Sequence, residues 1–325
     1  MKKIEKAIWT IRRETKIHCQ HLSLKSTRPL LSETSRPTAS VHTIQPGQIQ
    51  GSQKNHQRPR TSDYRFVAAV VIVTVLCAGV YLAPVEAQDL LKVRHGVFNP
   101  LAYLTASFVH GDVMHLTINL VFFWLFGFLL YFVNSAVEKQ RFFLYALLVL
   151  FTVLPLVNYS LLFYFGVYKS GAGFGLSVVD SGLIGLTLPS LIMYFRAKLD
   201  GFNSVLFLTS MSLLAFFLIL VLYMVSLRLI LLPLAVLVLG LFFGVFVFKR
   251  ILSFLWRSLS RRETIVESCF VLLLLLFYFV SITSLFPATV LSGIGATDVV
   301  SHYIGLVFGI IPFSLYAMLI SFSRR

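Results

Sequence analysis

Eight apolar segments, each close to the roughly 20 residues that cross a bilayer as a helix, follow a polar stretch at the start of the chain. Short polar loops separate the segments, and Arg228 divides the long apolar run between residues 204 and 248 into two spans. This pattern predicts an all-α fold, a polytopic membrane helical bundle of about eight transmembrane helices. The predicted spans are Phe66–Leu82, Val113–Val133, Phe142–Phe165, Leu176–Phe195, Ser204–Leu222, Leu229–Phe248, Ile265–Leu285 and His302–Ser321.

Composition supports the membrane interpretation. Of the 325 residues, 57% are hydrophobic and only 13% are charged, about half the charged share of a soluble domain. Cys19, Cys77 and Cys269 are isolated in sequence, so they predict neither a disulfide framework nor a metal site. The net charge of +15 would suggest nucleic acid in a soluble protein. Here the basic residues lie mainly before Phe66 and in short loops, where contact with membrane lipid explains them and no nucleic-acid partner is expected.

The stretch before Phe66 holds 13 Lys or Arg against 4 acids, with no apolar periodicity long enough to build a core. We expect residues 1–65 to form a basic disordered tail and residues 66–322 to form the transmembrane domain. Two other interpretations of the tail remain open: a short basic amphipathic helix on a membrane surface, from Met1 to Ile17, and an organelle transit peptide.

The basic residues between the spans predict the orientation. With a cytoplasmic N-terminus, the inside loops and the C-terminal end hold 11 Lys or Arg, and the outside loops hold 4. The excess predicts that both termini are cytoplasmic, and we expect an integral protein of a prokaryotic plasma membrane. The helices that begin near Val113, Leu176 and His302 then run in the same direction, so their first turns lie at one depth below the external face.

Ser177 lies near the start of one of these helices, and His302 is expected to begin another. A serine in a membrane helix is ordinarily a small packing residue, but glycines recur on the same helix faces, at Gly182, Gly185, Gly305 and Gly309. Faces without side chains let two helices approach closely, so contact between them would bring His302 toward Ser177. An imidazole can accept the proton of a serine hydroxyl and later return it, and the positive end of the helix dipole at Ser177 favours an oxyanion.

His115 and Asn119 are four residues apart and therefore share one helix face near the same depth. One interpretation is simple hydrogen bonding between helices. The other is an oxyanion hole, in which both side chains donate to the negative oxygen of a tetrahedral intermediate. A metal site built from His110, His115 and His302 is disfavoured, because no Asp or Glu stands at ligand spacing.

Together these residues resemble the rhomboid family of intramembrane serine proteases, over roughly Phe66 to Ser321. The resemblance rests on His110, His115 and Asn119 in the second span, on Gly175, Ser177, Gly182 and Gly185 in the fourth, and on His302, Gly305 and Gly309 in the last. It implies that Ser177 is the nucleophile, His302 the general base and acid, and His115 with Asn119 the oxyanion donors. It also implies substrates that are transmembrane proteins, cleaved in or beside their membrane segments, with no cofactor and no metal.

The sequence departs from the family directly after the nucleophile, where Val178 stands in place of the usual glycine. Ser181 is a second candidate nucleophile, because Gly182 follows it directly. It is the weaker candidate, because it lacks the preceding glycine and the later glycine spacing of the family. Asp180 is an ionisable residue inside a span and so a functional candidate in its own right, although a Ser/His dyad needs no third acid. His110 is likewise a weaker candidate.

The chain also departs from the family in length. Three spans separate the serine helix from the histidine helix, whereas the archaeal and bacterial type of six-helix core has one. We therefore expect two additional helices within about residues 204–290. An even insertion leaves Ser177 and His302 on the same side of the membrane. Two alternatives to a protease remain: a rhomboid-like protein that binds membrane clients without cleaving them, and a transporter.

Overall fold

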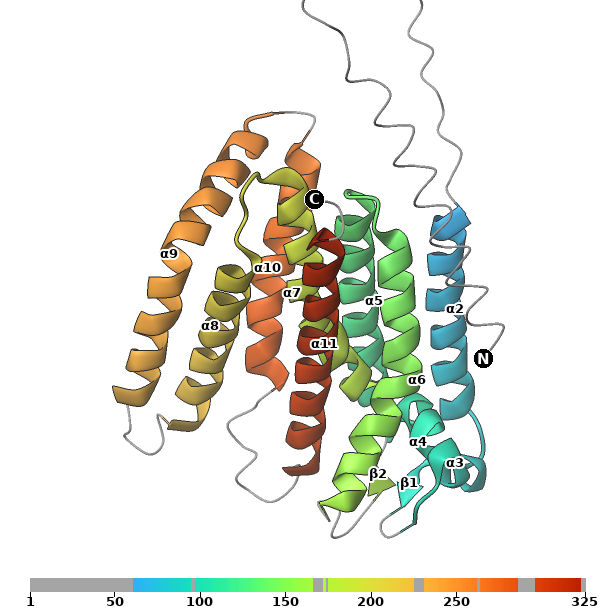
Figure 1. Ribbon diagram of the computed structural model, residues 1–325. Coiled ribbons are helices and arrows are strands. Elements are labelled where there is room, and N and C mark those ends of the chain that lie inside the picture. The colour runs from blue at the N-terminus through green and yellow to red at the C-terminus, as the bar shows by residue number, and fades with distance from the viewer. Residues whose placement is uncertain are drawn as a thin grey trace, which may run out of the picture. The chain divides into compact units, whose positions relative to one another are not determined.

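The computed structural model describes residues 61–94, 97–165, 172–173, 175–224, 231–261, 264–285 and 296–322. Within these residues, eight helices are long and apolar enough to cross a membrane (Figure 1), so the prediction of an all-α polytopic bundle is confirmed. Most of the expected tail, and Arg228, lie outside the described residues. The long helices are α2 (Thr61–Tyr81), α5 (Val113–Ser135), α6 (Gln140–Tyr164), α7 (Ser177–Lys198), α8 (Ser204–Met224), α9 (Leu231–Leu259), α10 (Ile265–Leu285) and α11 (Ala296–Phe322).

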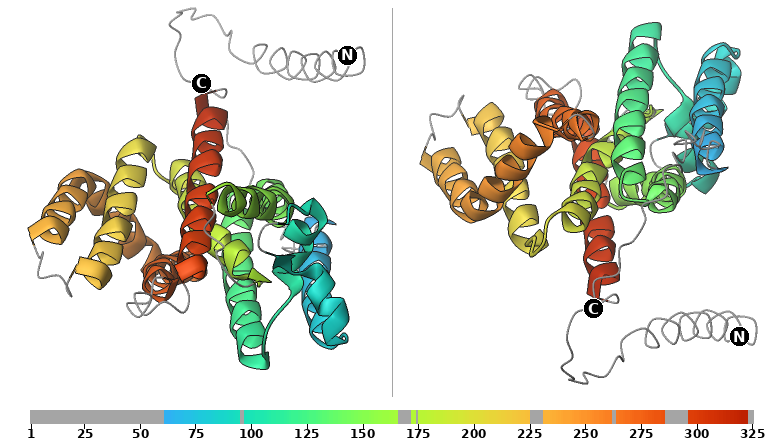
Figure 2. Two further views of the ribbon diagram at one scale, coloured as in Figure 1. Left: turned by 90° about the horizontal axis from the view of Figure 1, so that it is seen from below. Right: turned by 90° about the horizontal axis from the view of Figure 1, so that it is seen from above.

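Helix α7 is the centre of the bundle. Every residue from Val178 to Phe195 is buried, and α5, α6, α10 and α11 pack around the helix. The views along the bundle show α7 enclosed by these neighbours (Figure 2). Its glycines and serines permit close packing on several sides, and polar side chains bond across the contacts. One such bond joins Asn134 Nδ2 of α5 to Ser190 Oγ of α7 at 2.9 Å.

Helices α8 and α9 form an outer pair at one edge of the bundle (Figure 1). The principal contacts of α9 are with α8 and α10, whereas α10 reaches both α5 and α7. The ring of Phe270 on α10 stacks on that of Phe132 on α5, with 3.9 Å between centroids. Tyr194 of α7 donates a hydrogen bond from its hydroxyl to Glu267 of α10 at 3.2 Å. The outer pair therefore joins the rest of the bundle through α7 and α10.

Three helices run well beyond the limits that hydropathy predicts. Helix α2 begins at Thr61, inside the expected tail. Helix α9 continues past Phe248 as far as Leu259, and α11 begins before His302, at Ala296. The expectation that His302 opens its helix was therefore wrong. Hydropathy marks the part of a helix that lies in hydrocarbon, whereas the backbone hydrogen bonds continue wherever polar residues also favour a helix.

The connection between α2 and α5 contains short elements that no periodicity in the sequence predicts. They are α3 (Val85–Leu91), β1 (Val93–Arg94), α4 (Pro100–Thr105) and the 3₁₀ turn η1 (Ala106–Phe108). The Asn99 side chain caps α4 by accepting from the amides of Leu101 and Ala102 at 3.1 and 3.3 Å. Strand β1 pairs antiparallel with β2 (Ala172–Gly173), which ties this connection to the segment that leads into α7.

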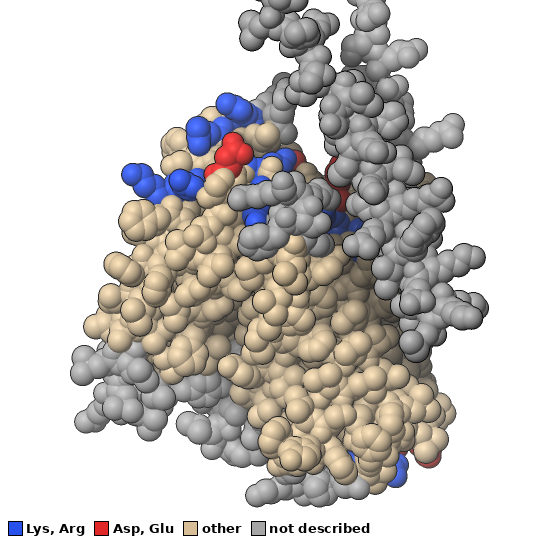
Figure 3. Space-filling model, in the orientation of Figure 1, with Lys and Arg blue, Asp and Glu red and all other residues tan. Residues whose placement is uncertain are grey.

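Charged side chains gather at the ends of the bundle, and no charged side chain of the described residues is in view on the face between them (Figure 3). Large hydrophobic side chains are exposed along the helices, among them Phe128, Leu148, Phe242 and Leu315. Water would not favour such a surface, but hydrocarbon does, so the chain is an integral membrane protein. We call the end that carries the α5–α6, α7–α8 and α9–α10 turns the basic end, and the opposite end the Ser177 end.

Candidate active site

The first two turns of α5 carry His115 and Asn119 at the Ser177 end. Asp112 caps the helix, and its carboxylate accepts a hydrogen bond from the His115 amide at 2.8 Å. Asn119 is buried, and its Nδ2 has no hydrogen-bond partner among the described residues. Buried amide donors are rarely left unsatisfied, so this group is suited to binding water or a substrate oxygen.

Gly175 brings the segment before α7 directly against these two side chains. Its φ of +117° is a conformation that side-chain-bearing residues rarely adopt, and its amide donates to the Ala106 carbonyl at 2.9 Å. A Cβ at this position would lie 3.0 Å from His115 Cε1 and 3.7 Å from Asn119 Nδ2. Ser177 follows two positions after Gly175, so the backbone that leads into α7 lies against His115 and Asn119.

The glycine faces of α7 and α11 are in contact. A Cβ at Gly305 would lie 2.9 Å from Ser181 Cβ, and one at Gly309 would lie 2.9 Å from Gly185 Cα. Backbone carbonyl oxygens of each helix also approach the glycines of the other, as in the Cα–H···O contacts of closely packed membrane helices. Any side chain at these positions would force the two helices apart.

These contacts also fix the register of α11 on α7. From Gly305 to Gly309 the contact advances by one turn on α11 and by one turn on α7, so the two helices run parallel. Both helices have the same rise per residue, and His302 lies just under one turn before Gly305. His302 is therefore level with the first turn of α7, which Ser177 begins.

The half-buried His302 has a defined tautomer. Its Nδ1 lies 3.0 Å from the carbonyl oxygen of Leu285, the last residue of α10. A carbonyl oxygen only accepts, so Nδ1 carries the proton and donates it to this bond. In the neutral imidazole, Nε2 then presents a lone pair, which is the form that can accept a proton from a serine hydroxyl.

The two serines of the region differ in their surroundings. Ser181 is completely buried, and its hydroxyl donates to the Ser177 carbonyl at 2.7 Å. Ser177 is half-buried at the start of α7, and within the described residues neither its amide nor that of Val178 forms a backbone hydrogen bond. Val178 does not hold the helices apart, because its carbonyl oxygen is the atom nearest to the Cβ position of Gly305.

The sequence analysis missed Asn158 of α6, which joins the histidine helix at Ser301, directly before His302. Its Nδ2 donates to Ser301 Oγ at 3.3 Å, and both residues are buried. The signal was present, because an amide within a membrane span ordinarily faces the bundle interior. Its partner could not be read from the sequence, since 143 positions separate the two residues.

His110 lies in the loop before α5, where its ring packs edge-on against that of His115 with 5.1 Å between centroids. Its Nδ1 is 3.2 Å from the Phe108 carbonyl oxygen, and burial, helped by the nearby His115, lowers the pKa of His110 to about 4. The imidazole is therefore neutral at pH 7. Within the described residues, no three His, Cys, Asp or Glu side chains gather as metal ligands would.

Asp180 is buried in α7, and neither of its carboxyl oxygens has a hydrogen-bond partner among the described residues. Cys77 of α2 lies within electrostatic reach of it. The carboxyl group is three positions along α7 from Ser177, whereas the helix face toward α11 is formed by Ser181, Gly182 and Gly185.

The fold and the site together define a polytopic α-helical membrane protein with a cluster of polar side chains buried at one end. Comparison with protein-family models, with curated proteins and with solved structures finds no match to this chain. The resemblance to rhomboid proteases therefore rests on the residues described above.

Proposed function

We propose that this protein is a rhomboid-type intramembrane serine endopeptidase that cleaves membrane proteins in or next to their transmembrane segments. The observation that carries the proposal is the convergence of three distant segments at the Ser177 end. Gly175 packs on His115 and Asn119, while the glycine contact of α11 with α7 sets His302 level with the first turn of the serine helix.

In the proposed reaction, Ser177 Oγ attacks the carbonyl carbon of the scissile peptide bond while its proton passes to His302 Nε2. The developing oxyanion accepts hydrogen bonds from Asn119 Nδ2, from His115 and from the backbone amides at the start of α7. The protonated His302 then gives its proton to the leaving amine as the C–N bond breaks, which leaves an acyl-enzyme ester. Water, with His302 again as base, hydrolyses the ester and restores the serine.

The same proposal includes the orientation. With the basic end in the cytoplasm, both termini are cytoplasmic and the Ser177 end lies just below the external face, where water for hydrolysis can enter. A substrate helix must unwind before its peptide bond can reach Ser177. Helix-breaking residues near the outer end of a substrate segment should therefore favour cleavage.

The test is covalent labelling of the full-length protein in detergent micelles with a fluorophosphonate probe, followed by peptide mass spectrometry. We expect label on Ser177, and we expect Ser177→Ala and His302→Ala each to abolish it. Ser181→Ala is the matched control, because it removes a hydroxyl one turn further along α7, and it should label like the wild type. Label on Ser181, or no label on a correctly folded wild type, would refute the proposal and favour a client-binding protein without protease activity.

A further inference from the structure

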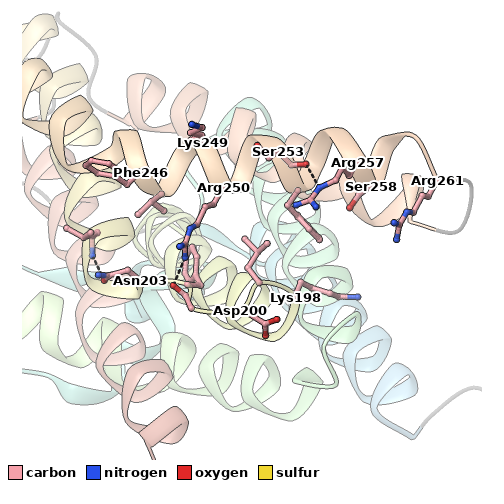
Figure 4. Close-up of a pocket in the computed structure, with 16 residues that line it drawn as sticks. Lys198, Asp200, Asn203, Phe246, Lys249, Arg250, Ser253, Arg257, Ser258 and Arg261 are labelled. Atoms are coloured by element: carbon pink, nitrogen blue, oxygen red, sulfur yellow. Dashed lines mark hydrogen bonds between the residues drawn. The ribbon is translucent and has the colours of Figure 1, made fainter.

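A pocket of about 950 Å³ opens at the basic end of the bundle, between the last turns of α9 and the loop that joins α7 to α8 (Figure 4). Among the residues that line it, one is acidic, Asp200, and five are basic, Lys198, Lys249, Arg250, Arg257 and Arg261. Figure 4 shows Arg250 reaching from α9 across to the loop. The pocket lies at the opposite end of the bundle from Ser177 and belongs to no part of the proposed active site.

The pocket changes from apolar to basic along α9. Phe246 and Val247 line its inner part, and the arginines follow in the direction of the helix end, from Arg250 to Arg261. The 29 residues of α9 span about 43 Å, which exceeds the roughly 30 Å of bilayer hydrocarbon. The last turns of the helix therefore lie at the level of the lipid headgroups. Trp256, which is 77% exposed, lies in these turns, as aromatic residues at the membrane boundary do.

Two of the three arginines are held in place by hydrogen bonds and still have donors to offer. Arg250 Nη1 donates to the Gly201 carbonyl at 2.9 Å, and Arg257 Nε donates to the Ser253 carbonyl at 3.1 Å. A guanidinium group has five N–H donors, so each retains several. Lys198 is paired with Glu267 at 2.9 Å. No ion pair of Arg250, Arg257 or Arg261 is found in the part of the chain that the structure describes.

We propose that this pocket binds the phosphate headgroup of an anionic phospholipid, with an acyl chain against the apolar residues near Phe246. Guanidinium groups match phosphate oxygens in charge and geometry, and basic pockets between membrane helices favour anionic headgroups. A zwitterionic lipid would bring a quaternary ammonium toward the same arginines and would bind less well. The bound lipid would connect the outer pair α8–α9 to the segment that leaves α7, so it would hold the added helices against the core.

Native mass spectrometry of the full-length protein in non-ionic detergent tests this site, with phosphatidylglycerol and phosphatidylcholine added separately. We expect one phosphatidylglycerol to remain bound where phosphatidylcholine does not. The variant Arg257→Gln/Arg261→Gln should weaken phosphatidylglycerol binding about 25-fold, because each basic residue near the headgroup contributes about fivefold. The matched control is Arg65→Gln/Arg141→Gln, which removes two exposed arginines outside the pocket and should change binding by less than about twofold.

Further arms identify the ligand. Inorganic phosphate and glycerol phosphate, which lack acyl chains, should not displace the bound lipid at equal concentration. Displacement by either would overturn the lipid assignment in favour of a soluble phosphate. Equal retention of both phospholipids, or equal loss of binding in the two arginine variants, would overturn the site itself. Ser177→Ala should bind the lipid like the wild type, so the result is independent of the proposed protease activity.

Discussion

Gly305→Ala is the substitution that tests most directly how the contact of α11 with α7 positions the proposed catalytic pair. The new Cβ would lie 2.9 Å from Ser181 Cβ, whereas carbon atoms in contact are ordinarily about 3.5–4.0 Å apart. Helices α7 and α11 must therefore separate by about 1 Å at Gly305, which lies about one turn from His302. In the proposed mechanism Ser177 gives its proton to His302 Nε2, so a displacement of this size should disturb that transfer, and such misplacements lower rates about a hundredfold.

The assay is the second-order rate of fluorophosphonate labelling, together with the thermal unfolding of the same preparation. We expect labelling of Gly305→Ala to slow about a hundredfold, while overpacking lowers the free energy of unfolding by about 1–3 kcal/mol. Gly79→Ala in α2 is the matched control, because nothing lies within 4 Å of its Cβ position, and both readouts should stay at wild-type values. Wild-type labelling by Gly305→Ala would refute the argument that this contact sets the geometry.

Three further predictions concern buried polar side chains. Asn119→Ala should slow labelling about a hundredfold through loss of an oxyanion donor, whereas Asn134→Ala, in the same helix near the basic end, should leave the labelling rate of the folded protein unchanged. Burial lowers the pKa of His110 to about 4 in the folded protein, whereas the unfolded chain takes up this proton near pH 6.5. The free energy of unfolding should therefore fall by at most about 3 kcal/mol as the pH drops from 6.5 to 4. His110→Gln should flatten this profile in pH-dependent thermal unfolding. Asp180→Asn should leave the labelling rate unchanged. It should not lower the unfolding temperature either, because it removes a buried carboxyl group whose oxygens have no hydrogen-bond partner among the described residues. A large loss of labelling would place Asp180 in the site.

The spans could be predicted from the sequence because hydrocarbon imposes a simple requirement on composition and length. The prediction for α10, Ile265–Leu285, matches the structure at both ends. It failed where helices leave the hydrocarbon, as at Ala296 and Leu259, because hydropathy does not register a helix in the headgroup region. The short elements between α2 and α5 depend on pairing with the distant strand β2, so no local pattern predicts them.

The candidate site was predictable to the extent that polar residues are rare inside membrane spans. A polar side chain in such a span has to face the bundle interior, which drew attention to Asn119 and Asp180 from sequence alone. The positive φ of Gly175 and the bond of His302 to the Leu285 carbonyl required the structure, since both depend on how distant segments meet. The basic pocket could not be predicted for a related reason. The sequence shows its arginines as loop charges, but it does not show that α9 continues as a helix and brings them to one pocket.

The burial of α7 has a consequence for the order in which the protein is made. The chain is synthesised from its N-terminus, so α7 is complete long before α11, which covers its glycine face. Until then this face must be covered by lipid or by other proteins of the insertion machinery. The first turn of α7 lacks the imidazole of His302 until α11 has been inserted. A ribosome that stops early would thus release a membrane protein without the proposed catalytic pair, so the incomplete chain would lack the proposed protease activity.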